Sequence, residues 1–129
     1  MNRLHDIEGE LYIFPSAESG RTKPAVSGYR PQHKIHDNYQ TSGQHEYINS
    51  NQAVPGGTVS TKVWLLTPDV YPKSIWIGRT IGVFEGARQV GTLTITRIIN
   101  EVLLGNPETF NPIWVEPAGL TVEGHKIGS

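Results

Sequence analysis

The sequence contains no cysteine, and its positive and negative charges nearly cancel. Without cysteine the chain forms no disulfide, has no thiolate ligand for a metal and offers no cysteine nucleophile. There are 11 Lys and Arg residues against 12 Asp and Glu residues, which gives a formal net charge of -1. Such a chain has no summed positive field to attract nucleic acid or an anionic membrane surface. Any binding of nucleic acid must therefore depend on a local group of residues.

Longer sequence patterns are missing as well. No run of about 18 apolar residues occurs, and residues 1–14 contain no apolar segment of signal-peptide length, so we expect a soluble, cytoplasmic protein without membrane contact. The pattern G-x-x-x-x-G-K-[ST] is absent, which excludes a P-loop GTPase and argues against a bound nucleotide. No G-x-S-x-G nucleophile turn occurs either. We therefore expect a protein that is not an enzyme and needs no cofactor.

The clearest positive signal is a β-hairpin in residues 78–99. Thr80–Phe84 is rich in β-forming residues, and residues 85–89 carry the glycine and polar side chains that a turn needs. In the second strand, Leu93 and Ile95 fall on one face while the threonines beside them fall on the other. This alternation with a period of two predicts a half-buried strand.

Further short strands are expected along the chain, with no amphipathic helix between them. Their predicted ranges are Glu10–Phe14, Gln32–His36, Gln44–Ile48, Val59–Leu66 and Ser74–Ile77. We interpret Asp37–Gly43 as a polar loop. This pattern predicts an all-β barrel or sandwich, and a closed barrel is favoured because closure removes exposed edges. We place the barrel at residues 10–100, after a lead-in at 1–9 and before a C-terminal extension at 101–129 that adds strands or binds a partner.

Five short motifs occur in the order and rough spacing found in the C-terminal domain of elongation factor Tu. They are Glu10–Ile13, Gly28–Gln32, Val54–Gly56, Leu66–Pro68 and Glu85–Gly91. The chain resembles that domain over about residues 8–100, as a standalone copy without the GTPase domain. The resemblance implies a six-stranded antiparallel barrel, in agreement with the strand pattern.

In that family, the domain lays one edge against the T-stem backbone of aminoacyl-tRNA. The resemblance implies contact residues at Gln32, at Thr41 or Ser42, and at Glu85 with Gly86, with Arg30, Lys34 and Arg88 nearby. Polar side chains and a backbone amide of this kind meet phosphate or 2′-OH groups without reading base sequence. The chain departs from the family after Gln32, where an aromatic run is replaced by His33-Lys34-Ile35-His36, and the extension has no counterpart.

Two functions follow from these observations. The first is a protein-interaction module that binds a partner in translation or a toxin, as an immunity protein or decoy, with Trp114 of the extension at the interface. The alternative is a tRNA-binding module whose affinity falls steeply with salt, because neutralised phosphates release counterions. The balanced charge and the altered strand after Gln32 favour the interaction module.

Plainer interpretations of the same residues remain open. Gly86 and Gly91 also suit turn and bulge geometry, and Arg30 and Gln32 beside Pro31 also suit a loop held to the barrel. The three tryptophans also suit packing in the core or at its rim; they are Trp64, Trp76 and Trp114.

Three histidines and two carboxylates raise the question of a metal site. They are His33, His36, His45, Asp37 and Glu46. Imidazole and carboxylate groups are zinc ligands, but residues 33 and 36 face opposite sides of a strand. We therefore expect surface histidines and no metal.

Overall fold

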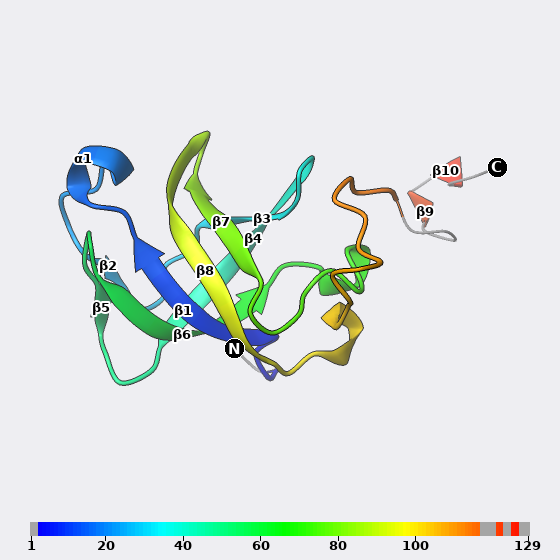
Figure 1. Ribbon diagram of the computed structural model, residues 1–129, viewed down its shortest axis with the longest axis horizontal. Coiled ribbons are helices and arrows are strands. Elements are labelled where there is room, and N and C mark those ends of the chain that lie inside the picture. Colours follow the sequence, from blue (N-terminus) through cyan, green and yellow to red (C-terminus); the bar gives the residue numbers. More distant parts are fainter. Residues whose placement is uncertain (1–2, 117–120, 123–124, 127–129) are drawn as a thin grey trace.

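The computed structural model describes residues 3–116, 121–122 and 125–126. Six antiparallel strands close into a barrel in the order β1-β6-β4-β3-β7-β8 (Figure 1). Their bounds are β1 Ile7–Ile13, β3 Gln32–His36, β4 Tyr39–Tyr47, β6 Thr58–Leu65, β7 Thr80–Glu85 and β8 Arg88–Ile98. The predicted all-β, six-stranded antiparallel barrel is confirmed.

The other described elements are short. They are helix α1 (Ser16–Ser19), the 3-10 turns η1 (Pro68–Val70) and η2 (Glu101–Leu103), and the two-residue strands β2 (Ala25–Val26), β5 (Gln52–Ala53), β9 (Thr121–Val122) and β10 (His125–Lys126). Within the described ranges, none of the helices has the length and apolar character needed to cross a membrane.

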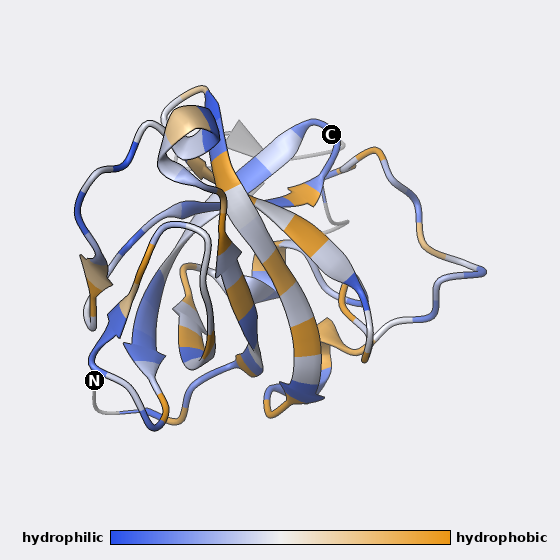
Figure 2. Cartoon of the chain, turned by 60° about the vertical axis from the view of Figure 1, so that its left-hand side comes forward, coloured by the Kyte–Doolittle hydropathy of each residue, from blue (hydrophilic) through white to orange (hydrophobic). Residues whose placement is uncertain are grey.

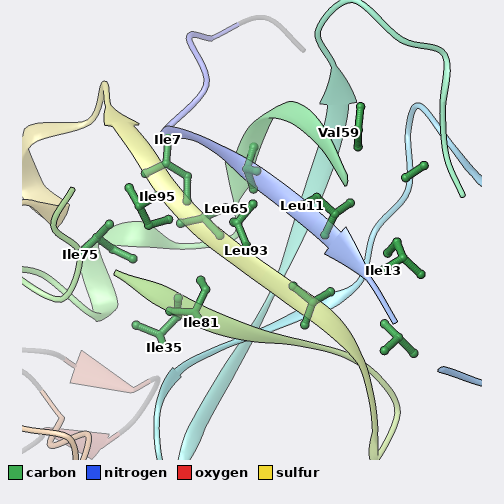
Figure 3. Packing of buried hydrophobic residues seen from close by; sticks show 14 of the residues in the cluster. Ile7, Leu11, Ile13, Ile35, Val59, Leu65, Ile75, Ile81, Leu93 and Ile95 are labelled. Carbon is green, nitrogen blue, oxygen red and sulfur yellow. The ribbon is translucent and has the colours of Figure 1, made fainter. Parts of the chain in front are cut away.

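Alternation along the strands builds the core. Leu93 and Ile95 of β8 are at most 1% exposed, and the threonines beside them face outward. Figure 2 shows the same alternation as orange bands along the strands. In β1, Ile7 and Leu11 are also fully buried, and Figure 3 shows them packed against the β8 side chains. Each such side chain stabilises the barrel by about 1.5–3 kcal/mol through its removal from water.

The predicted lead-in at 1–9 is wrong at its C-terminal end, because β1 begins at Ile7. The Asp6 side chain is already fully buried, and its carboxylate accepts the Leu65 backbone N–H at 2.6 Å. Arg3 donates two hydrogen bonds to the same carboxylate, at 2.8 and 3.0 Å. The polar residues just before β1 therefore belong to the barrel, because Asp6 binds the backbone at the end of β6.

The predicted loop at Asp37–Gly43 is also wrong. Strand β4 already begins at Tyr39, so that Asp37 and Asn38 form a tight turn of a β3–β4 hairpin. Polar residues on the outward face of β4 conceal the strand in the sequence. Ile35 is an extra residue in β3, where the register shifts between Lys34 and His36.

The predicted strand at Ser74–Ile77 is not formed. Ile75 makes only an isolated bridge to Leu104, although it is fully buried. The extension returns along this part of the barrel (Figure 1): Leu103 of η2 joins the core, and residues 104–116 add no strand. Part of the predicted extension at 101–129 lies outside the described residues.

Candidate interaction surfaces

A polar row crosses the outer face of strands β4, β3 and β7. The register places Gln32 of β3 between Ser42 of β4 and Phe84 of β7, and all three are half-buried. Lys34, two residues along β3 on the same face, holds its ammonium 5.7 Å from the centre of the Phe84 ring. Arg30 is exposed just before the strand. The fold thus brings Gln32 and Ser42 together with two cations.

Thr41 and Ser42 are the two alternatives for one predicted contact, and they face opposite sides of β4. Thr41 is 4% exposed, and its hydroxyl donates to the Leu66 carbonyl oxygen at 3.0 Å. It packs in the barrel and is not a surface residue, contrary to the prediction. Ser42 is the member of this pair that faces outward, opposite Gln32.

Glu85 ends strand β7 and is engaged within the molecule. Its carboxylate forms an ion pair with Arg21 and accepts a hydrogen bond from the Tyr29 hydroxyl. The Arg21 guanidinium also lies 5.0 Å from the centre of the Tyr29 ring. Burial and the hydrogen bond to Glu85 raise the pKa of Tyr29. This arrangement stabilises the loop after α1 on the hairpin, and it occupies the carboxylate predicted to face a partner.

The tip of the β7–β8 hairpin is governed by backbone geometry. Gly86 has a φ of 61°, a left-handed conformation that glycine adopts without steric cost. At Gly91, a Cβ atom would collide with the carbonyl oxygen of Tyr12 on the neighbouring strand. Arg88 is exposed, and its Nε donates to the Glu18 carbonyl oxygen at 3.1 Å. Both glycines thus have a structural role, as the plainer interpretation held.

Trp114 lies on a different part of the surface from the row around Gln32. Its indole Nε1 donates to the Val70 carbonyl oxygen at 3.0 Å, and its ring centre lies 4.7 Å from that of Tyr39. The Asn38 side chain accepts from its backbone N–H at 2.6 Å and donates to its carbonyl at 3.2 Å. These partners are not visible in the sequence, because Asn38 and Trp114 are 76 positions apart.

Trp114 therefore anchors the extension, and its neighbours are presented to solvent. Ile113 is 49% exposed and Val115 is 68% exposed. Both line a pocket of about 290 Å³ together with Trp114, Val70 and Pro72. The result is an ordered apolar surface, which we call the Trp114 surface.

The predicted surface location of the histidines is wrong. His33 and His45 are fully buried inside the barrel, and His36 is 8% exposed. His33 faces the barrel interior, whereas His36, beyond the register shift, is covered by the extension: its ring stacks on Phe110, and its Nδ1 bonds to the Asn111 carbonyl oxygen at 2.9 Å. Inside the barrel, the rings of His33 and His45 meet with their Nε2 atoms 2.8 Å apart.

The hydrogen bonds of this pair define its tautomers. Nδ1 of His33 faces the Thr41 carbonyl oxygen at 3.3 Å, so this nitrogen carries a proton and Nε2 of His33 is the acceptor. His45 then donates from Nε2, which leaves its Nδ1 as a buried acceptor without a partner among the described residues. Burial lowers the pKa of His33 to about 4 and holds that of His45 well below its ordinary value.

No cluster of three His, Cys, Asp or Glu side chains suited to a metal ion occurs in the described ranges. Among the residues that the structure describes, the histidine pair has no third ligand of that kind, and Asp37 and Glu46 are exposed. A comparison of the chain with models of known protein families finds no match.

Proposed function

We propose that this chain is a non-enzymatic interaction module, similar to the C-terminal domain of elongation factor Tu, that binds a protein partner through the Trp114 surface. The partner belongs to the translation machinery or is a toxin that engages it, against which the module serves as an immunity protein or decoy. The sequence resemblance supports this choice of partner. A chain of near-zero net charge suits protein association better than a broad contact with phosphates.

The exposure of Ile113 and Val115 beside an anchored Trp114 carries the proposal. Asn38 fixes the backbone of this segment, so that little conformational entropy is lost when a partner covers it. Ordered aromatic and aliphatic residues at the centre of a contact, with a pocket beside them, are typical of protein interfaces. The pocket of about 290 Å³ has room for a large apolar side chain of the partner.

The test uses the purified protein as bait in a total cell extract, with both protein and RNA analysed. A recovered protein is then purified and its affinity measured by calorimetry. We expect the double variant Ile113→Asp, Val115→Asp to abolish binding, because two charges would be buried in an apolar contact. Leu104→Asp is the matched control, since Leu104 is 54% exposed and lies outside the pocket.

Deletion of the whole extension is not a suitable variant. Leu103 is fully buried in the core, and its carbonyl accepts the Ile75 N–H at 2.8 Å. Removal of residues 101–129 would therefore damage the barrel as well as the surface. Unchanged binding by the Ile113 and Val115 double variant, or recovery of RNA alone, would contradict the proposal.

A tRNA-binding module is the second candidate, and the row around Gln32 favours it. Gln32 and Ser42 lie side by side, and Lys34 and Arg30 flank Gln32 with two positive charges. Filter binding with total tRNA tests this at low and at physiological salt. We expect Lys34→Gln to reduce the salt slope by about 1 if this face contacts phosphate, whereas Arg97→Gln on β8 leaves it unchanged. Glu85 is not suitable for substitution, because it holds Arg21 and Tyr29.

A further inference from the structure

A second hollow, of about 490 Å³, lies where β6 runs into η1. Its volume is within the range of roughly 300–1,000 Å³ that is usual for ligand pockets. Pro68 and Asp69 line this hollow, whereas Val70 and Pro72 line the pocket of the Trp114 surface. The η1 turn thus separates the two, and the hollow is a distinct feature that no sequence pattern indicates.

The fold holds Leu66 exposed on the wall of the hollow. Its side chain is 62% exposed, although its backbone is fixed by hydrogen bonds. The Leu66 N–H donates to the Ser42 carbonyl oxygen at 2.9 Å. Its own carbonyl accepts from the hydroxyls of Thr41 and Tyr71, at 3.0 and 2.6 Å. Because its backbone is fixed, the Leu66 side chain stays exposed and is available as an apolar contact for a ligand.

The residue after Leu66 is strained. Thr67 has φ 50° and ψ 57°, a left-handed conformation that is rare and strained for a β-branched residue. Backbone strain of this kind gathers at functional sites, where the surrounding structure maintains it. Here the bonds to the Leu66 carbonyl maintain the strained turn.

Trp64 supplies a second apolar wall with a fixed position. It is 8% exposed, and its indole Nε1 donates to the Arg3 carbonyl oxygen at 2.9 Å. The Arg3 guanidinium is satisfied within the molecule by Asp6 and by the Leu65 carbonyl oxygen at 2.9 Å. The hydrogen bond to Asp6 raises the pKa of Arg3, and Asp69 adds a smaller effect. The positive charge of Arg3 is therefore balanced by neighbouring carboxylates.

Arg30 also lines the hollow, and its charge, unlike that of Arg3, is not balanced by a carboxylate in an ion pair among the described residues. It takes part in none of the ion pairs found in the described part of the chain. Its guanidinium donates only to the neutral side-chain oxygen of Gln44, at 2.7 Å. Gln44 and Ser42 line the same hollow and add an amide and a hydroxyl group to its wall. A planar guanidinium with free N–H groups matches the geometry of a carboxylate.

We propose that this hollow binds a carboxylate attached to an apolar group, with the carboxylate on Arg30 and the apolar group between Leu66 and Trp64. Two sources share this chemistry: a small organic acid, and a peptide segment in which an acidic residue neighbours a large apolar one. The site is independent of the Trp114 surface and of the proposed function.

Titration of the ¹⁵N-labelled protein by NMR tests the proposal with three probes. They are 4-phenylbutyrate, its neutral amide, and a capped peptide with adjacent Glu and Phe residues. We expect millimolar phenylbutyrate to shift the amides of Ser42, Gln44 and Thr67, and the neutral amide to bind about tenfold more weakly or less. A peptide that binds more tightly than phenylbutyrate identifies a peptide source, and the reverse order identifies a small acid.

Two variants and a control complete the test. Arg30→Gln should weaken phenylbutyrate binding about tenfold, and Leu66→Ser should weaken it severalfold, while both leave the rest of the spectrum intact. Arg88→Gln, an exposed arginine at the far hairpin, should bind as the parent does. The proposal is overturned if none of the probes shifts these amides, if acid and amide bind equally, or if Arg30→Gln binds unchanged.

Discussion

The buried histidine pair predicts a barrel that loses stability in mild acid. In the unfolded chain each histidine titrates near its ordinary pKa of 6.5, whereas burial lowers that of His33 to about 4. The folded protein therefore binds fewer protons than the unfolded chain between these values. The stabilising effect is complete above about pH 6.5 and is lost as the pH falls toward 4.

The magnitude follows from these two pKa values. At pH 5 nearly all unfolded chains carry a proton on His33, and few folded molecules do. The free energy of unfolding therefore falls by about 2 kcal/mol relative to pH 7 through His33 alone. His45, whose pKa is lowered by burial and by the charge of His33, adds an effect of the same sign. Against a typical total of about 5–15 kcal/mol, this loss is large.

Urea unfolding at a series of pH values, followed by tryptophan fluorescence, measures the effect. The matched variant is His33→Phe, His45→Phe, which replaces both rings of the pair with apolar rings; besides the bond between the rings, it removes the 3.3 Å bond from His33 to the Thr41 carbonyl oxygen. Between pH 6 and 5, its stability should depend on pH less steeply than that of the parent, by about 1.2 kcal/mol per pH unit through His33, with a contribution of the same sign from His45. Equal stability of the parent at pH 7 and 5, or an unchanged slope in the double variant, would refute the reasoning.

Three further substitutions test other parts of the fold, the first two by urea unfolding and the third by protease digestion. Gly91→Ala should lower the free energy of unfolding by more than about 1 kcal/mol, because the new Cβ atom would collide with the Tyr12 carbonyl oxygen. Unchanged stability would mean that the two strands can move apart without cost. Asp6→Ala should lower the free energy of unfolding by about 1–3 kcal/mol, because the buried Leu65 N–H loses its acceptor, and a neutral effect would argue against that network. Trp114→Ala should speed proteolysis of the segment around it while the far-UV circular dichroism stays unchanged; an unchanged cleavage rate would show that other contacts hold this segment.

The strands were predictable wherever alternation is set by local residues. In β8, apolar residues at 93 and 95 alternate with threonines, and this pattern is visible without tertiary information. The start of β4 at Tyr39 was not predictable in the same way, because its outward residues are polar and its inward ones include Gly43 and His45. Such a strand is identified only by what it packs against.

The positions of the candidate surface residues depend even more on contacts between residues that are far apart in the sequence. The burial of His36 follows from the extension, whose Phe110 ring stacks on the imidazole and whose Asn111 carbonyl oxygen bonds to it. The orientation of Trp114 follows from Asn38, far away in the sequence. The row around Gln32 was partly predictable, since a resemblance to a known domain gave Gln32 and Ser42, but only the register shows that Thr41 faces inward.

The β3–β4 hairpin supports both candidate surfaces. Gln32 and Ser42 are on its outer face, and the buried rings of His33 and His45 are on its inner face. Its turn contains Asn38, which holds the backbone of Trp114. Protonation of the inner histidines acts on the strands that position all of these residues. Acid should therefore weaken both surfaces together, whereas a substitution at Gln32 or Trp114 should affect one surface and leave the other intact.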